Sequence, residues 1–572
     1  MNHPNTFYKT QLEKHQLEVK SFNKKLIGMS SLRLLVFLLT IAGIYLTFSF
    51  WQVALGIGIV GVSIFIFLLS KYTDVKRLSN ISKALVTINE EEIKIASGDF
   101  HYRDTGEQFQ DPLHYYSLDI DLFGRGSFFQ FINRTTIKEG TETLAKALTA
   151  NAIDDIEFKQ NTIKELAEKP EWRQQFSAAA TLIEVETPAL KIIEWLKSHT
   201  LFLPKMMVWL PRVFSLLSLV IIALGMFKII DLGFVGYWLL FGLIITGLYL
   251  KKINILASNT DKVRDTFRQY ALLLNLIEKE TFSSGLLKNK QSYIQQEHKK
   301  ASEIFSQFSK YLDALDNRNN MISAIFGNGF FLSDLKNSYK IEQWISKYKT
   351  TVDHWFEVVS FFDAYNTLGN YAFNHPDYIY PKIVANKTVI EAEGLGHPLL
   401  DKNKRVDSNL EIYNKEFFIV TGANMAGKST FLRTVSLHIV MANTGLPVCA
   451  KSSKYSPVKL ITSMRTSDSL TDDSSYFFSE LTRLKFIVDE IAKEPYFIIL
   501  DEILKGTNST DKAIGSRKFV EKLVAGNATG IIATHDLSLC EISKELDEVK
   551  NHFFDAQIIN DELFFDYKFK DG

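Results

Sequence analysis

Cysteine is scarce in this 572-residue sequence, which contains only Cys449 and Cys540. Two cysteines at that spacing cannot build a disulfide framework or a cysteine-based metal site, so a reducing, cytosolic environment is predicted around them. The sequence also has no net charge, because 65 Lys and Arg residues balance 65 Asp and Glu residues. Nucleic-acid-binding domains usually carry a basic surface, so this balance disfavours a nucleic-acid partner without excluding a local basic stripe.

Charge is missing from the stretch between Leu34 and Ser70. One membrane-spanning helix needs about 20 apolar residues, so this stretch is too long for one span and fits two. We predict a transmembrane hairpin over 31–71 with its turn near Ser49, preceded by an amphipathic helix over 1–30. The polar N-terminus has no early apolar stretch with a small-residue cleavage site, which argues against a cleaved signal peptide.

A second apolar block predicts a second transmembrane hairpin over 212–250, with Lys228 and Asp231 at its tip. Basic residues precede and follow both hairpins, and positive residues mark the cytoplasmic side of a span. We therefore expect an integral protein of a bacterial-type inner membrane with four spans. Both termini, the region 73–205 and the C-terminal domain are then cytoplasmic. For either block, the alternative is a pair of core helices buried in a soluble domain.

The remainder is predicted to be a helical region followed by an α/β domain. Residues 73–205 begin and end as helix, with a β-like stretch at 115–132, and 253–375 has the apolar spacing of helices. Over 378–572, apolar strands alternate with helical stretches, a pattern typical of an α/β domain with a mainly parallel sheet. The predicted fold class is α plus α/β, with both hairpins inserted in the helical region.

A glycine-rich loop follows the apolar strand 417–420 and opens a helix. The loop reads TGANMAGKST and matches G-x-x-x-x-G-K-S in the strand–loop–helix context that this motif requires. Backbone N–H groups and the helix N-terminus suit a phosphate chain, with Lys428 on the β- and γ-phosphates and Ser429 on Mg²⁺. A chance match in a glycine-rich turn is the alternative. The predicted nucleotide-binding residues are Gly422, Ala423, Asn424, Met425, Ala426, Gly427, Lys428, Ser429 and Thr430.

Two further strands are predicted to end beside this loop. The apolar run 496–500 delivers Asp501 and Glu502 to the sheet edge where ligands bind. Asp501 is expected to hold Mg²⁺, and Glu502 to position or deprotonate the attacking water. The next strand ends in His535, which could sense the γ-phosphate or simply terminate the strand. With Lys428, Glu502 and His535 form the predicted catalytic set of an ATP hydrolase that uses ATP and Mg²⁺.

Several segments resemble the motifs of the MutS family, which is known for DNA mismatch repair. Residues 421–433 resemble the family sequence TGPNMAGKSTFLR, with alanine in place of the proline. Residues 501–511 resemble DEIGRGTSTxD, and residues 533–535 match the family's ATH. A further likeness, at 118–148, is to the opening of the family's helical core domain.

Residues 468–480 resemble the family segment D-x-L-x-x-G-x-S-T-F-x-x-E. The likeness places Ser475 on the serine that, in the family, reaches across a dimer to the γ-phosphate held by the partner subunit. Asp473 stands where the family has glycine, and a carboxylate near phosphate is expected to weaken or rearrange that contact. The resemblance thus implies a homodimer with two composite ATPase sites.

The departures from the family decide between functions. We expect no mismatch-reading domain of the family's kind, because the sequence before residue 115 is too short for it, and we expect a hairpin at 212–250, where family members extend levers to a DNA clamp. The leading interpretation is a membrane-anchored ATPase whose dimer closure transmits movement through helices to the membrane segments or to an unidentified protein partner. The alternative is a MutS-type clamp on mismatched or branched DNA, tethered to the lipid bilayer; a transporter of the ABC kind is a third. The lysine cluster at 288–300 fits a solvated helix face better than a phosphate contact.

Overall fold

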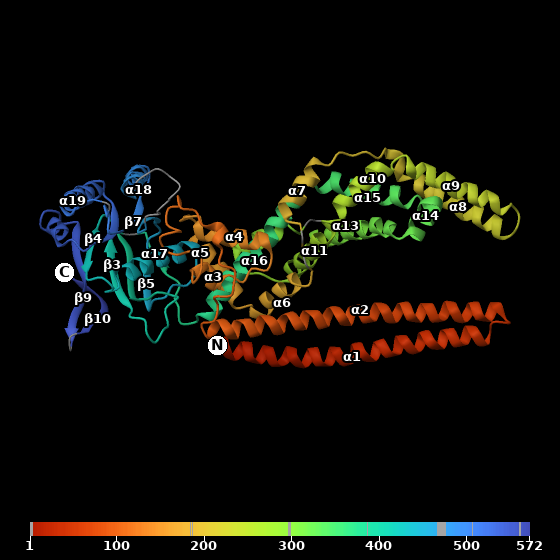
Figure 1. The fold of residues 1–572 in the computed structure, drawn as a ribbon, viewed down its shortest axis with the longest axis horizontal. Coiled ribbons are helices and arrows are strands. Elements are labelled where there is room, and N and C mark those ends of the chain that lie inside the picture. The colour runs from red at the N-terminus through yellow and green to blue at the C-terminus, as the bar shows by residue number, and fades with distance from the viewer. Residues whose placement is uncertain are drawn as a thin grey trace.

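The computed structural model describes residues 4–183, 185, 187–295, 299–385, 387–465, 476–505, 507–559 and 562–572. A mixed-sheet α/β domain lies at one end of an elongated molecule, a helical body lies in the middle, and helices project at the other end (Figure 1). The predicted order, a helical region followed by an α/β domain, is confirmed.

The first projection is a hairpin of two long helices, α1 (Pro4–Leu46) and α2 (Trp51–Ala96). Both are long and apolar enough to cross a membrane. The helices approach closely at Gly61, where an added Cβ would lie 2.1 Å from the Thr40 hydroxyl oxygen. The amphipathic segment predicted at 1–30 is continuous with the apolar segment, because α1 runs unbroken through Gly28.

The second projection contains three apolar helices, α8 (Leu210–Met226), α9 (Leu232–Gly247) and α14 (Met321–Phe331). After α9 the chain bends by 68° into α10 (Leu250–Asp261). Helix α14 packs against α9 with little space between the backbones, since a Cβ on Gly242 would lie 2.2 Å from the Gly329 carbonyl oxygen. Helix α14 was not predicted from the sequence, because its 11 residues are too few to stand out as a span.

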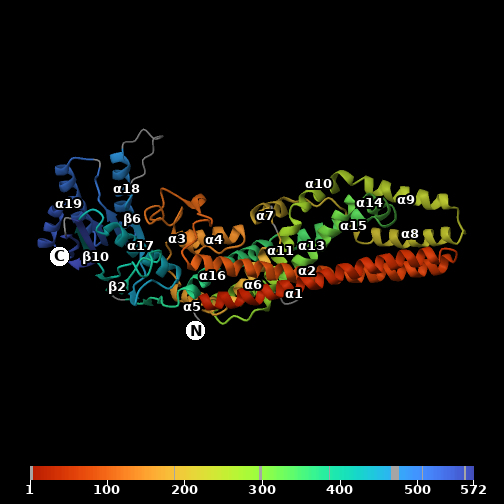
Figure 2. The ribbon, with the colours of Figure 1, turned by 60° about the horizontal axis from the view of Figure 1, so that its bottom comes forward.

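Four predicted spans are not supported. Among the described residues, α1 and α2 have the length and apolarity of spans, and the bent pair α9–α10 makes a third if it counts as one. Helix α8 has 17 residues and stops at Met226, where Lys228 adopts a left-handed conformation (φ 56°) that breaks the helix. Both projections point away from the sheets toward the same end of the molecule (Figures 1 and 2).

The helical body surrounds α16 (Val352–Asn374), which leads directly into the α/β domain. Its other helices are α3 (Phe128–Ile132), α4 (Lys138–Thr149), α5 (Ile156–Ala167), α6 (Pro170–Ala180), α7 (Ala189–Ser198), α11 (Arg264–Lys279), α12 (Gly285–Ser292), α13 (Ala301–Asp316) and α15 (Ser333–Tyr348). Short 3-10 helices lie at η1 (Glu107–Phe109), η2 (Lys205–Val208), η3 (Asn317–Asn319) and η4 (Leu537–Lys544).

The β-like stretch predicted at 115–132 is wrong. The structure has turns there, followed by α3. Left-handed conformations at Asp121, Gly124 and Gly126 interrupt any strand. The aromatic residues that suggested β-structure fill the core instead, as Phe128 shows with a fully buried side chain.

The α/β domain contains two sheets. The smaller has the order β1-β5-β2-β3, and the larger has the order β10-β9-β4-β8-β7-β6. Five neighbouring strands of the larger sheet are parallel, and β10 pairs antiparallel to β9 at the edge. The strands are β1 (Lys382–Ile383), β2 (Thr388–Leu395), β3 (Ser408–Tyr413), β4 (Phe417–Gly422), β5 (Ser452–Tyr455), β6 (Lys459–Ser463), β7 (Tyr496–Asp501), β8 (Thr529–Ala533), β9 (Val549–Ile559) and β10 (Glu562–Asp571).

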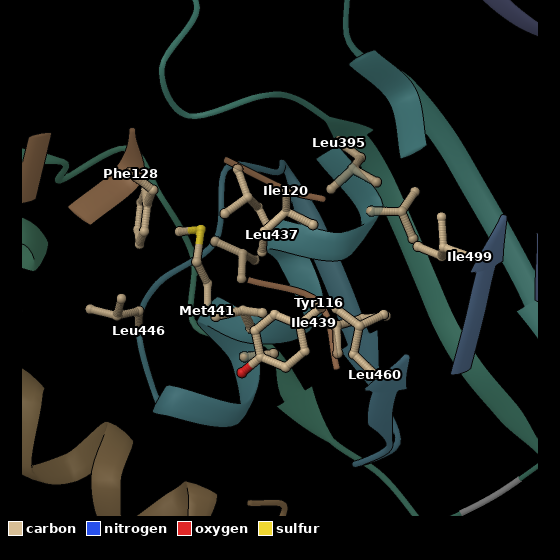
Figure 3. Close-up of a cluster of buried hydrophobic side chains, with 14 of the residues drawn as sticks. Tyr116, Ile120, Phe128, Leu395, Leu437, Ile439, Met441, Leu446, Leu460 and Ile499 are labelled. Atoms are coloured by element: carbon tan, nitrogen blue, oxygen red, sulfur yellow. The ribbon is translucent and has the colours of Figure 1, made fainter. Parts of the chain in front are cut away.

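Three helices accompany these strands, α17 (Lys428–Thr444), α18 (Tyr476–Ile491) and α19 (Ser509–Ala525). Helix α17 is buried along most of its length, and its core continues into the helical body. Figure 3 shows Leu437 and Met441 of α17 in one cluster with Tyr116, Ile120 and Phe128. The α/β domain and the helical body therefore share one hydrophobic core.

A buried histidine in α17 predicts acid sensitivity. His438 is 2% exposed, and its Nε2 lies 3.2 Å from the Ser453 hydroxyl oxygen. Burial lowers the pKa of His438 to about 4. The unfolded chain, with a histidine pKa near 6.5, therefore takes up a proton that the folded chain refuses as the pH falls from 7 to 5, which costs about 2 kcal/mol of stability.

His438→Gln should remove this share of the acid sensitivity while keeping a group that can bond Ser453. The measurement is the shift in thermal midpoint between pH 7 and pH 5 for both proteins. A shift of the same size in the variant would contradict the assignment.

Candidate nucleotide-binding site

The glycine-rich loop joins β4 to α17 at the carboxyl edge of the larger sheet. Gly422 (φ 147°) and Gly427 (φ 103°) both adopt conformations that favour glycine. A Cβ at Gly422 would lie 2.8 Å from the Phe554 carbonyl oxygen, so strand β9 allows no side chain there. The two glycines thus let the loop turn tightly and begin α17 at Lys428.

The Lys428 side chain folds back over this loop. It is 6% exposed, and its Nζ donates hydrogen bonds to the carbonyl oxygens of Gly422 (2.8 Å) and Ala423 (3.0 Å). Burial lowers the pKa of Lys428, against the opposing effect of the Asp501 and Glu502 carboxylates. A buried ammonium whose hydrogen bonds go to neutral carbonyl oxygens, with an imidazole beside it, is well suited to bind an anion.

Two pairs of polar side chains lie next to Lys428. The Ser429 hydroxyl donates a 2.6 Å hydrogen bond to Asp501 Oδ2, so the residue after the loop lysine contacts the end of β7. His535 Nε2 lies 2.8 Å from Glu502 Oε1 and 3.3 Å from Lys428 Nζ. Three chain segments far apart in sequence therefore meet at one sheet edge.

Glu502 has a strained backbone. Its φ is 49°, in the left-handed region that non-glycine residues rarely adopt. Its N–H donates to the Ala533 carbonyl oxygen at 2.9 Å, which ties the end of β7 to β8. Lys505 Nζ lies 3.8 Å from Glu502 Oε2. One carboxylate oxygen of Glu502 therefore faces the Lys505 ammonium, and the other faces the His535 imidazole. Strain of this kind is typical of functional sites.

These side chains border a cavity of about 460 Å³. That volume is within the range of small-molecule sites. The cavity is also bordered by the segment 404–406, which precedes β3, and by Tyr567 of β10. His397 also borders the cavity, and burial and the charges of Arg433 and Arg405 lower its pKa to about 4, so this imidazole is neutral near pH 7.

Most of the predicted site residues border this cavity, but not all of them do. Ala423, Asn424, Met425, Gly427, Lys428, Ser429, Thr430, Asp501, Glu502 and His535 border the cavity. Ala426 points into the core instead, with 1% exposure. Ser475 and Asp473 lie outside the described residues.

The donor set can be compared with what a nucleotide and Mg²⁺ require. The described residues contain no group of three or more His, Cys, Asp or Glu side chains placed to hold a metal ion. Mg²⁺ commonly takes one or two protein oxygens and completes its shell with water and phosphate oxygens. The adjacent oxygens of Ser429 and Asp501, beside a buried lysine, match that requirement.

Sequence reasoning missed the part played by Glu480. This residue of α18 is 3% exposed, and its carboxylate accepts the backbone N–H groups of Leu504 (2.5 Å) and Lys505 (3.0 Å). Glu480 thereby fixes the loop that follows Glu502. The motif at 468–480 includes this glutamate, but nothing in the sequence says which backbone groups it meets.

Comparison with known proteins places the relationship in the C-terminal region. Residues 418–572 match the family model MutS domain V. The chain is 31% identical over 212 residues to the DNA mismatch repair protein MutS of Methanococcoides burtonii, which covers 36% of this chain and 24% of that protein. It is 31% identical over 208 residues to MutS protein homolog 4 of Homo sapiens, covering 34% of this chain and 22% of that protein.

The DNA mismatch repair protein MutS of Staphylococcus aureus is 28% identical over 241 residues, covering 41% of this chain and 27% of that protein. The chain thus spans about a quarter of the length of the curated relatives it matches.

Removing the Glu480 carboxylate should loosen the loop after Glu502. Glu480→Ala leaves the buried N–H group of Leu504 without its acceptor, at a cost of about 1–3 kcal/mol, and also removes the acceptor of the Lys505 N–H. Amide hydrogen exchange in the peptide 501–505 should then rise about tenfold or more, as measured by mass spectrometry. The control is Lys485→Ala, an exposed change on the same helix. Unchanged exchange in Glu480→Ala would show that the two hydrogen bonds do not hold the loop.

Proposed function

Because the chain is a MutS-family protein by its C-terminal region, we propose that it binds and hydrolyses ATP with Mg²⁺. One observation carries the proposal: a buried lysine, a serine–aspartate pair and a glutamate–histidine pair border a single cavity. Each has the residue type and neighbour that phosphoryl transfer to water requires. The fold alone would not distinguish this activity from other uses of an α/β domain.

The loop would hold the phosphate chain. Lys428 exchanges its bonds with the carbonyl oxygens of Gly422 and Ala423 for bonds with β- and γ-phosphate oxygens, and loop N–H groups add further donors. Ser429 and Asp501 would hold Mg²⁺, which when bound neutralises charge on the phosphates. The hydrogen bond between these two side chains keeps their oxygens together at the sheet edge.

Glu502 would orient and deprotonate the attacking water. The contact with His535 Nε2 restricts the carboxylate to one orientation, and the backbone bond to Ala533 fixes the residue that carries it. A base on a fixed backbone needs little rearrangement before proton transfer. His535 also lies next to Lys428, so it can respond to the occupancy of the phosphate position.

The protein would act as a homodimer anchored in a membrane. The resemblance gives Ser475 the role of reaching the partner subunit's γ-phosphate, so each site needs both chains. The apolar α1–α2 hairpin and the α8, α9 and α14 helices are the parts suited to lipid. Dimer closure on ATP would then move the helical body and these projections against an unidentified protein partner.

Charged contacts supply a physical connection for this movement. Asp121, at a turn of the helical body, pairs with Arg433 of α17 (3.3 Å) and with Arg465 (2.7 Å), just before the segment that carries Ser475. Further along, Glu92 of α2 pairs with Arg134 at 2.6 Å. The first two ion pairs join the helical body to α17 and to the end of β6, and the third joins the helical body to the first hairpin.

A second candidate function is a membrane-tethered clamp on mismatched or branched DNA. It is favoured by the relatives that are named DNA mismatch repair proteins. The two candidates differ in whether DNA changes the ATPase rate.

The first test is ATP turnover by the full chain in nanodiscs, with and without duplex, forked and mismatched DNA. Glu502→Gln should lose at least about 100-fold in turnover while still binding ATP, because it removes the base and leaves the loop intact. Lys428→Ala should lose ATP binding as well. The leading proposal expects the same rate with every DNA. Tight DNA binding that changes the rate would favour the clamp.

Membrane anchoring is tested by cysteine labelling in right-side-out vesicles. The background is Cys540→Ser, which leaves only the buried Cys449. Ser49→Cys and Lys228→Cys, at the exposed tips of the two projections, should react with an impermeant maleimide. Ser97→Cys, exposed at the far end of α2, should react only after permeabilisation. Equal labelling of all three without permeabilisation would contradict a membrane-spanning first hairpin.

A further inference from the structure

A group of cations lies where the second projection joins the helical body. Arg212 is in the first turn of α8, and Lys336 and Lys340 are one turn apart on α15, which packs against α8 and η2. Arg212 and Lys336 are exposed, and Lys340 is half-buried. We call these three residues the α8–α15 cation cluster.

The α8–α15 cation cluster has no acidic partner within ion-pair distance in the described part of the chain. Two nearby acids are engaged elsewhere: Glu342 accepts the N–H groups of Phe202 (2.8 Å) and Leu203 (3.1 Å), and Asp334 pairs with Arg318 at 3.3 Å. No ion pair of the described residues therefore offsets the mutual repulsion, and an anion placed among the three groups would relieve it.

The electrostatics of Lys340 agree with this geometry. Burial lowers the pKa of Lys340, and the charges of Lys336 and Arg212 lower it further. Its Nζ lies 5.2 Å from the centre of the Tyr311 ring, a weak substitute for a counter-ion. The positive charges are thus close enough to act on one another.

Exposed apolar side chains border the cluster on the side of the projection. Trp209, just before α8, is 53% exposed, and Met206 and Val208 of η2 are exposed beside it. From Arg212 onward, α8 presents an exposed apolar face that includes Leu216 and Leu217. Aromatic and basic residues at the end of an apolar helix are the pattern found at a membrane surface.

We propose that Arg212, Lys336 and Lys340 bind the phosphate headgroup of an anionic phospholipid whose acyl chains cover the exposed face of α8. The apolar border decides the source of the phosphate, since a free phosphate ion or a nucleic acid would leave that face uncovered. This inference rests on the membrane anchoring proposed above and adds a specific lipid class to it.

The test compares lipid binding by the purified full chain in neutral detergent, using fluorescent phosphatidylglycerol and phosphatidylcholine. The test variant is R212Q/K336Q/K340Q. The matched control is K288Q/K299Q/K300Q, which removes the same charge from exposed lysines of the helical body. We expect the wild type and the control to prefer phosphatidylglycerol, and the test variant to bind it about 10- to 100-fold more weakly with unchanged binding of phosphatidylcholine.

Three results would overturn the proposal. The first is that the test and control variants lose phosphatidylglycerol binding equally, or that neither variant loses it. The second is displacement of the labelled lipid by inorganic phosphate at equal concentration, which would assign the cluster to a free ion. The third is a loss of duplex DNA binding confined to the test variant, which would assign it to nucleic acid.

Failure of this proposal is separable from failure of membrane anchoring. Reconstitution of the test variant into phosphatidylcholine nanodiscs reports insertion without an anionic lipid, and labelling of Ser49→Cys and Ser97→Cys in right-side-out vesicles reports membrane spanning. If the test variant inserts normally and retains its preference for phosphatidylglycerol, the proposed headgroup site is wrong and the anchoring proposal stands.

Discussion

The buried polar contacts of α16 hold the molecule together. Asp363, 1% exposed, accepts the N–H groups of Thr136 (2.9 Å) and Ile137 (3.0 Å) and so fixes the start of α4. Two turns further on, Asn370 donates to Glu92 of α2 at 2.9 Å. Buried polar groups are costly unless satisfied, so each contact admits one arrangement of its partners. Helix α16 leads straight into the smaller sheet. The positions of the first hairpin and of the α/β domain are therefore both fixed by this one helix.

In the candidate site, a few hydrogen bonds likewise hold Glu502 and the loop that follows it. The strained backbone of Glu502 is held by a bond to Ala533 in the neighbouring strand and, through the following loop, by Glu480 of α18. Helix α18 directly follows the segment that includes Ser475. In the dimer proposed above, a change in that segment would be transmitted through α18 to the loop after Glu502. The same helix contacts the helical body, since Arg483 donates to the Tyr115 carbonyl oxygen at 2.7 Å.

Local patterns in the sequence predicted the α/β domain and the residues that meet at its sheet edge. The strand–loop–helix at Lys428 and the apolar strand before Asp501 have strong local signals, and parallel strands bring their ends to one edge. Features that depend on distant partners were not predictable. Helix α14 is recognisable as part of the apolar projection only because Gly329 meets Gly242, and the aromatic stretch around Phe128 became a turn-rich core because α17 covers it. The continuity of α1 likewise reflects packing on α2 rather than the change from polar to apolar sequence at its midpoint.

The contacts of α16 also set an order of events during synthesis. Asn374 donates to Glu92 at 3.0 Å across 282 positions of sequence. At a translation rate of about 5–20 residues per second, this partner emerges about 15 to 55 s after the glutamate. The first hairpin is thus synthesised well before its partners in α16. During that interval Glu92 and Tyr8 have none of their α16 partners. A nascent chain stalled before residue 370 would therefore lack the hydrogen bonds that join its first hairpin to α16.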